Sequence, residues 1–282
     1  MRRSFEAPRE TYETNAMGTV NVLEAVRSAR SVEAVVVVTS DKCYENRETP
    51  EPYREEDPLG GHDPYSSSKA IAELVTSAYR RSYFSAPGSP HIASARAGNV
   101  IGGGDWGEDR LVPDLIRAAV SQGNVSLRHP GATRPWQHVL SPLSGYLVLA
   151  EALCGEAPDP AGEGAAAGDR GGGAAPGTRF ARAWNFGPDP ADARTVEWVV
   201  GRVSSLWPGG LSWSVDDGPH PHEAGLLALD SSLARRELAW TPLVGLEQGL
   251  EATVAWYRAW REGQDMREVT LGQVGELGDV VR

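Results

Sequence analysis

The sequence predicts an α/β fold in which helices cover both faces of a parallel sheet, the doubly wound arrangement. The first indication is Val35–Val38, an uninterrupted β-branched run typical of a parallel strand that is buried on both faces. The second is the polar segment Thr39–Lys42 directly after that run. Open α/β sheets place their chemistry at the carboxyl ends of their strands, so this segment is a candidate for the reacting groups.

Helices and strands are expected along the chain in the following order. The first helix is expected over residues 9–30, where apolar side chains form one stripe that Asn15 and Gly18 interrupt. A strand over 34–40, a loop rich in Pro and Glu over 45–64, and a helix from Ser66 to about Phe84 come next. The remaining expected elements are strands at 92–96 and 183–186 and helices near 111–122, 142–154, 194–207 and 246–262.

Residues 155–179 differ from the rest of the chain, because they contain Gly, Ala, Pro and Asp in no periodic order. Such a segment cannot bury enough apolar surface to offset the loss of chain entropy on folding. We therefore expect a flexible insertion there.

Tyr65 and Lys69 are candidates for a catalytic pair. They stand four residues apart on a predicted helix and therefore share one face. An ammonium group near a phenol favours the phenolate, so we expect the pKa of Tyr65 to fall from about 10 toward neutrality. A phenolate can take a proton from a sugar hydroxyl while a hydride leaves to a nicotinamide. The spacing alone is weak, since Tyr-x-x-x-Lys arises often by chance and also fits a solvated helix start.

Four longer motifs strengthen this interpretation, and they are Thr39–Asn46, Gly61–Lys69, Arg96–Trp106 and Arg134–Val139. On these motifs the chain resembles the extended short-chain dehydrogenase/reductases, and within them the nucleotide-sugar 4,6-dehydratases. The resemblance runs from about Arg2 to the last residues and leaves out only the low-complexity stretch near 155–179. It implies a Rossmann-type fold with a smaller C-terminal substrate domain, NAD as the cofactor and a nucleotide sugar as the substrate.

The resemblance also implies a role for each of five catalytic residues. Tyr65 would be the base for the sugar C4 hydroxyl, Lys69 would hold the nicotinamide ribose, and Ser40 would hydrogen-bond the C4 oxygen. Asp41 would protonate the departing C6 hydroxyl, which requires a carboxyl group that stays protonated in a desolvated site. Lys42 would remove the C5 proton, which requires an amine with a lowered pKa.

The identity of residue 42 bears on the substrate. In dTDP-glucose dehydratases a glutamate stands where Lys42 stands, so the lysine points to the CDP-glucose branch of the family. Nucleotide-sugar epimerases lack an acid–base pair after this strand. Asp41 and Lys42 together therefore favour a dehydratase over an epimerase.

The resemblance places four further residues near the ligands. Asn99 would bind the substrate diphosphate, Arg110 would be a diphosphate-binding cation, and Arg134 would contact the nucleotide or its phosphates. Guanidinium groups suit phosphate oxygens because they can form two parallel hydrogen bonds. Asn15 would lie near the cofactor and anchor the catalytic helix. The alternatives are a surface residue at a helix start for Arg110, a plain loop arginine for Arg134 and a surface amide for Asn15.

Several other conspicuous residues are predicted to be structural. His138 and His222 are expected to be hydrogen-bonded or supporting residues, because a lone histidine is seldom an acid or base. Trp256 and Trp260 are expected to pack rather than bind a cofactor. Gly102–Gly104 follows a possible strand but does not lead into a dinucleotide-binding helix, so it is not interpreted as a pyrophosphate-binding motif.

The resemblance divides the chain into two regions. Residues 1–105 would be the remaining half of the NAD-binding domain with the catalytic residues. Residues 106–282 would mainly bind the nucleotide sugar, with some segments returning to the first domain. The family's first strand, Gly-rich turn and helix are not found, so about 80 residues are expected to be missing upstream, through a misplaced gene start. The strand at Val35–Val38 would then be left with an apolar edge.

Composition narrows the class of protein further. The chain has 282 residues and a formal net charge of −11, which argues against a nucleic-acid partner. Its two cysteines indicate neither a disulfide framework nor a metal site. It contains no membrane-spanning apolar run and no visible signal peptide, so the cytoplasm is the expected location. A homo-oligomer is expected by resemblance.

Three hypotheses remain open from the sequence alone. The chain is a dehydratase of CDP-glucose, a reductase of another specificity such as an epimerase, or a non-catalytic remnant or partner subunit. Loss of water from the substrate separates the first from the second. Poor folding and feeble NAD binding would favour the third.

Overall fold

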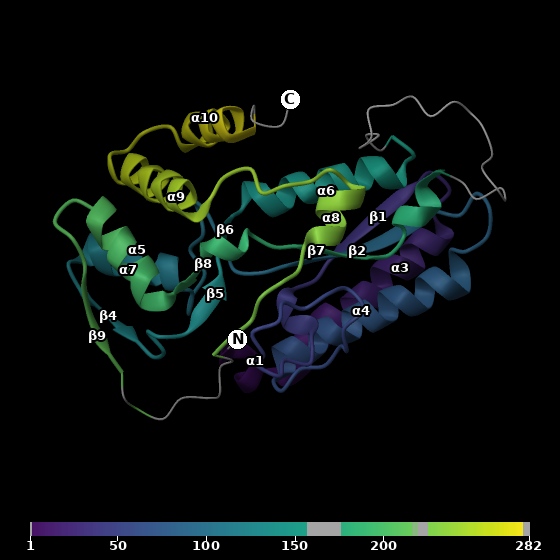
Figure 1. Cartoon of the computed structure of the whole chain (residues 1–282), viewed down its shortest axis with the longest axis horizontal. Coiled ribbons are helices and arrows are strands. Elements are labelled where there is room, and N and C mark those ends of the chain that lie inside the picture. The colour runs from purple at the N-terminus through teal and green to yellow at the C-terminus, as the bar shows by residue number, and fades with distance from the viewer. Residues whose placement is uncertain (1, 157–175, 217, 219–224, 279–282) are drawn as a thin grey trace.

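The computed structural model describes residues 2–156, 176–216, 218 and 225–278, and Figure 1 shows their arrangement. His222 and residues 157–175 of the expected insertion lie outside these ranges. The N-terminal helical segment consists of α1 (Arg2–Glu6), α2 (Pro8–Tyr12), a π-helical turn (Glu13–Met17) and α3 (Gly18–Ser28). The helix expected over 9–30 is thus present, with one π-helical turn at Asn15.

The main sheet confirms the α/β fold class. Strands β1 (Ala34–Val38), β2 (His91–Ala97) and β7 (Ala183–Phe186) are all parallel, and β2 is the central one. Helices α3 and α4 (Pro64–Tyr83) cover one face of the sheet, and α6 (Leu140–Leu153) covers the other (Figure 1). All these strands and helices match elements expected from the sequence, to within a few residues at each end.

Alternate residues of β1 face opposite layers of helices. Val35 and Val37 pack with Leu23 and Val26 of α3, whereas Val36 belongs to the hydrophobic cluster that includes α6. This follows from the two-residue period of a strand. The expectation that Val35–Val38 is fully buried is wrong, because all four side chains are partly exposed and Val38 is 48% exposed. Within the described ranges β1 pairs with β2 alone, so its other edge is open.

The remaining strands are short and form three separate pairs. They are β3 (Val100–Ile101) with β6 (Gln137–His138), β4 (Asn124–Leu127) with β9 (Ser212–Val215), and β5 (Thr133–Pro135) with β8 (Ala193–Thr195). These strands were not predicted, because two to four residues are too few to show a period. Beside them lie α5 (Leu111–Ser121), α7 (Val196–Leu206), α9 (Leu246–Arg261) and α10 (Met266–Gly278), while α8 (Ser232–Glu237) packs against β7.

The expected insertion ends earlier than predicted. Pro176–Phe180 form a short 3-10 helix instead of continuing the irregular segment to residue 179. Phe180 is buried, and its carbonyl oxygen accepts a 2.9 Å hydrogen bond from Trp184 Nε1. These two aromatic side chains fix the segment to the sheet, which a composition argument could not show.

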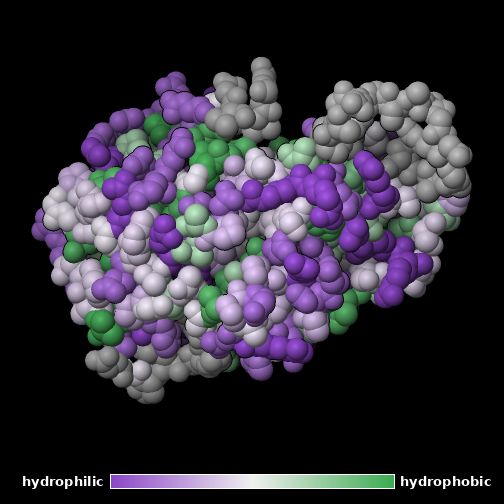
Figure 2. Space-filling model, viewed as in Figure 1, coloured by the Kyte–Doolittle hydropathy of each residue, from purple (hydrophilic) through white to green (hydrophobic). Residues whose placement is uncertain are grey.

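The surface seen in Figure 2 is mostly hydrophilic, with hydrophobic residues in scattered areas. Among the described residues, no helix is long and apolar enough to cross a membrane. The same ranges contain no cluster of side chains suited to hold a metal ion, and both cysteines are free thiols.

Gly103 explains why the three-glycine segment is not a phosphate-binding turn. A Cβ atom on Gly103 would lie 2.1 Å from Cγ of Trp256, a core residue of α9. The close approach of backbone to indole therefore requires glycine here. Trp256 is a packing residue, as predicted, and Trp260 contacts the ring of Trp106.

We expect Gly103→Ala to lower the free energy of unfolding by about 1–3 kcal/mol, because the added methyl group overpacks the contact with Trp256. Gly272→Ala is the matched control, since this glycine lies within α10 and has nothing within 4 Å of an added Cβ. The control should be neutral or slightly stabilising. Urea denaturation of the three proteins measures the difference, and equal midpoints for the two variants would contradict the packing argument.

Candidate active site

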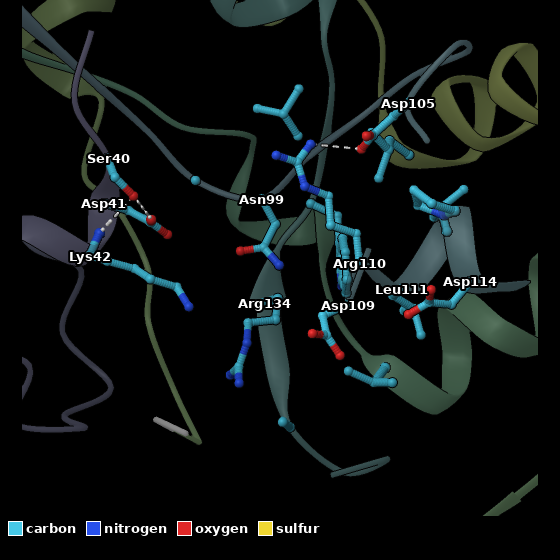
Figure 3. A pocket seen from close by; sticks show the side chains of 18 of the residues that line it. Ser40, Asp41, Lys42, Asn99, Asp105, Asp109, Arg110, Leu111, Asp114 and Arg134 are labelled. Carbon is cyan, nitrogen blue, oxygen red and sulfur yellow. Dashed lines mark hydrogen bonds and ion pairs between the residues drawn. The ribbon is translucent and has the colours of Figure 1, made fainter. Parts of the chain in front are cut away.

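A pocket of about 530 Å³ lies at the carboxyl ends of the main strands and extends toward α5 (Figure 3). Seven of the nine site residues predicted from the sequence line it, namely Ser40, Asp41, Lys42, Tyr65, Asn99, Arg110 and Arg134. They come from the segment after β1, from α4, from the loops after β2 and from β5, so residues far apart in sequence converge. Parallel strands place their ends at one edge of the sheet, which is why the pocket forms there.

Asp41 is the most deeply buried charged group of the pocket. It is 2% exposed, and its Oδ1 accepts a 3.0 Å hydrogen bond from Ser40 Oγ, whereas its Oδ2 has no partner. Burial raises the pKa of its carboxyl group, against the opposing effects of Lys42 and Ser40. A Cβ atom on Gly98 would lie 3.3 Å from Oδ2, so this glycine keeps space beside the unpaired oxygen. The environment suits a carboxyl group that holds a proton.

Tyr65 lies at the start of α4, where Asp63 caps the helix. The Asp63 carboxylate accepts hydrogen bonds from the backbone N–H groups of Tyr65 and Ser66 at 2.9 and 3.0 Å. The expected fall in its pKa is not seen: burial raises the pKa of Tyr65, and the effect of the Ser40 side chain opposes this only in part.

Lys69 and Asn15 are the two predicted residues that do not line the pocket. Burial lowers the pKa of the Lys69 ammonium group. Asn15 Nδ2 donates a 2.9 Å hydrogen bond to Ser68 Oγ, and Tyr12 Oη lies 2.7 Å from Ser67 Oγ. The π-helical turn is thus tied to the first turns of α4, which is the contact expected of a residue that anchors the helix.

Asn99, Arg134 and Arg110 occupy the middle of the pocket (Figure 3). Arg134 is mostly buried, and its guanidinium donates to the carbonyl oxygens of Thr133 and Gly225. The guanidinium of Arg110 instead forms a 2.9 Å ion pair with Asp105, and its side chain is 65% exposed. An exposed pair of this kind contributes little stability, so Arg110 can exchange partners at small cost.

Three pocket residues were missed by the sequence reasoning. Tyr146 of α6 lines the pocket, and burial, with the charge of Asp41, raises its pKa to about 12. Arg128 and His129 directly follow β4, a strand that was not predicted. Tyr146 carries no sequence signal, because it is a single tyrosine in an apolar helix far from the other motifs. A prediction of β4 would have drawn attention to the two basic residues at its end.

His138 is buried, and burial lowers its pKa to about 4. Its Nδ1 accepts a 3.4 Å hydrogen bond from the backbone N–H of Leu140. A neutral ring at the end of β6 agrees with the structural role that was predicted.

Comparison with known proteins gives the family. Residues 1–157 match the model of the NAD dependent epimerase/dehydratase family, which is more than half of the chain. The chain belongs to this family. A CDP-glucose 4,6-dehydratase of Salmonella typhimurium is 48% identical over 94% of this chain and 70% of its own length. A dTDP-glucose 4,6-dehydratase of Streptomyces griseus is 29% identical over 88% of this chain and 66% of its own length.

Solved structures of the epimerase/dehydratase family share the fold. A dTDP-glucose 4,6-dehydratase from Bacillus anthracis, in complex with NAD, has a TM-score of 0.69 and 25% identity over 90% of this chain and 70% of its own. A dTDP-glucose 4,6-dehydratase from Streptomyces venezuelae has a TM-score of 0.72 over 94% of this chain and 71% of its own. The fold class and the NAD dependence expected from the sequence are therefore those of the family.

The residues after β1 and in the first turns of α4 suit the nicotinamide end of NAD. Tyr65 and Lys69 lie one helical turn apart on α4, and Tyr65 lines the pocket together with Ser40 after β1. This group suits the nicotinamide and its ribose. A Gly-rich turn between a strand and a helix, suited to the pyrophosphate, is not present among the described residues.

Proposed function

We propose that this chain dehydrates CDP-glucose to CDP-4-keto-6-deoxyglucose. The observation that carries the proposal is the buried carboxyl group of Asp41, which has one unpaired oxygen at the pocket and lies beside Ser40 and Lys42. An acid and an amine at adjacent positions are what elimination of water requires. The 48% identity to a CDP-glucose 4,6-dehydratase supports the choice of sugar nucleotide.

The pocket residues would divide the proton transfers among them. Tyr65 accepts the proton of the C4 hydroxyl, which requires its phenolate form against the effect of burial on its pKa, and Ser40 hydrogen-bonds the same oxygen. Lys42 removes the C5 proton, which the C4 ketone makes acidic, and Asp41 gives its proton to the C6 oxygen, which leaves as water. When bound, NAD would supply the acceptor for the hydride from C4 and the donor of the same hydride to C6. The protonated Lys42 then gives the proton back to C5, and the proton that Tyr65 took replaces the one that Asp41 gave up, so the net change is the loss of one water.

Asn99, Arg134 and Arg110 would hold the diphosphate and the nucleotide. They line the middle of the pocket, between the reacting groups and α5. Local cations are needed here, because both the substrate and the protein, with a net charge of −11, are negatively charged. Arg110 would leave Asp105 to take up a phosphate oxygen.

The test is conversion of CDP-glucose by the 282-residue chain with added NAD, followed by mass spectrometry. We expect a product lighter by one water, and deuterium placed at C4 should appear at C6 of the same molecule. A product of unchanged mass with an inverted C4 would assign an epimerase instead. Failure of the folded chain to convert CDP-glucose, or equal conversion of dTDP-glucose, would contradict the proposal.

Three further expectations from the sequence stay proposals. The two-region division is supported by a hydrophobic cluster from Ile101 to Tyr257 that is separate from the clusters on the sheet.

We propose a homo-oligomer, because α3 and α4 expose the apolar side chains of Val22, Leu74 and Tyr83. Sedimentation analysis tests this. A cytoplasmic location agrees with a nucleotide-sugar substrate.

A further inference from the structure

Three polar side chains converge on the carboxylate of Glu73, a buried residue of α4. Thr39 Oγ1 donates to Oε1 at 2.5 Å, and Ser94 Oγ donates to Oε2 at 2.7 Å. Arg96 Nη2 donates to Oε2 at 2.8 Å. Glu73 and Arg96 are 2% and 3% exposed at their side chains, so this ion pair is fully inside the protein.

Arg96 is itself fixed from two further directions. Its Nη1 donates to Tyr44 Oη at 2.7 Å and to the backbone oxygen of Glu55 at 3.0 Å. Tyr44 Oη in turn donates to Asn185 Oδ1 of β7 at 2.7 Å. The network therefore joins α4 to β2, to β7 and to the segment that directly follows β1.

Net stability is a weak explanation for such a pair. Burying two charges costs desolvation energy that their attraction offsets only in part, and apolar residues of similar size often serve as well. Burial by itself raises the pKa of Glu73. The hydrogen bond and charge of Arg96, with the hydrogen bonds from Thr39 and Ser94, outweigh this effect and lower the pKa. Glu73 is thus a charged acceptor at a place where a neutral packing residue would suffice for the core.

Glu73 is linked to both segments that carry the predicted catalytic residues, namely α4 and the segment after β1. It stands four residues after Lys69 and eight after Tyr65, so the three side chains share one face of α4. Its partner Thr39 directly precedes Ser40 and Asp41. We propose that Glu73 is a positioning residue, which holds the strand end carrying Ser40 and Asp41 in place against the helix carrying Tyr65 and Lys69.

This inference rests on the proposed dehydratase function. Its physical basis is the distance between the reacting groups on α4 and those after β1. Tyr65 on α4 and Ser40 after β1 both line the pocket, so a small sliding of α4 along β1 would change the distance between them. Displacements near 1 Å in an active site can cost about 10²-fold in rate. The Thr39–Glu73 hydrogen bond joins α4 directly to the residue that precedes Ser40, whereas Ser94 lies within β2.

Thr39→Val and Ser94→Ala form a matched pair, because each removes one hydroxyl donor from the same carboxylate. We expect Thr39→Val to lower kcat by about 10–100-fold with little change in KM. Ser94→Ala should keep kcat within about threefold, and Thr39→Ser should restore it. Both removals should lower the melting temperature by a similar amount, because each removes one hydrogen bond to the same carboxylate, so melting temperatures alone should not distinguish them.

Hydrogen exchange gives a readout that does not depend on turnover. The backbone N–H groups of Lys42 and Cys43 donate to Ser40 Oγ and to Ser40 O. We expect these amides to exchange faster in Thr39→Val than in Ser94→Ala. If the parent chain converts no CDP-glucose, the proposed function fails while the exchange comparison still decides the positioning role. Equal exchange in the two variants, or equal loss of kcat, would overturn it.

Discussion

Replacing Tyr65 with phenylalanine should lower kcat for CDP-glucose by about 10²–10⁴-fold, the range typical of losing a positioned general base. The substitution removes only the hydroxyl of Tyr65, which lines the pocket, and leaves the ring, so binding of the sugar nucleotide should change little. The effect should therefore fall on kcat and not on KM. Steady-state kinetics over a range of CDP-glucose concentrations measures both.

Tyr83→Phe is the control for this substitution. Tyr83 lies at the last position of α4, is 49% exposed and does not line the pocket. Removing its hydroxyl should leave kcat unchanged. Activity of Tyr65→Phe within threefold of the parent chain would show that another group accepts the C4 proton.

Replacing Asp41 with asparagine should abolish dehydration and stabilise the protein at neutral pH. An amide cannot give a proton to the departing C6 hydroxyl, so we expect turnover to fall by about 10²–10⁴-fold. Stability should rise because burial raises the pKa of Asp41 above its value in the unfolded chain. The folded state then disfavours the carboxylate, at about 1.4 kcal/mol for each pKa unit.

The direction of this pH dependence can be worked out. The penalty in the parent chain is absent below the unfolded pKa of about 3.9 and grows as pH rises toward the folded pKa. The stability gain of Asp41→Asn should therefore be largest at neutral pH and vanish near pH 3. In the parent chain, turnover should fall as pH rises through the raised pKa, since the acid is then lost.

Asp189→Asn is the control, because Asp189 is an exposed residue paired with Arg235. It should change neither turnover nor the pH dependence of unfolding. Thermal unfolding of the three proteins from pH 3 to pH 8 provides the comparison. An Asp41→Asn variant less stable than the parent at pH 7 would show that Asp41 is held as a stabilising carboxylate.

The sequence contained enough information to predict candidate reacting groups that the structure brings into one pocket, but not their electrostatics. Ser40, Asp41 and Lys42 follow a strand that could be recognised, and Tyr65 begins a helix with a clear cap. Their convergence follows from parallel topology. The pKa of Tyr65 could not be obtained in the same way, because the degree of burial, which here outweighs the effect of a neighbouring charge, depends on residues from several elements.

Other features depended on contacts between distant segments. Tyr146 reaches the pocket only because α6 lies against the sheet, and the role proposed for Glu73 depends on Thr39 directly after β1 and Ser94 within β2. The short strands β3 and β6 form because they pair with each other, not because of any pattern of their own. Such features come from tertiary packing, which a single sequence does not display.

The open edge of β1 has a consequence for handling the protein in the test tube. Ala34–Val38 is a five-residue window of uncharged, mostly β-branched residues, and the backbone groups on the edge that no described strand pairs with can pair with the same window of another molecule. Folding is a first-order process, whereas such pairing is second-order in chain concentration. Dilution should therefore raise the yield of refolded protein, and a charged residue in place of the half-exposed Val38 would shift this competition toward the monomeric fold.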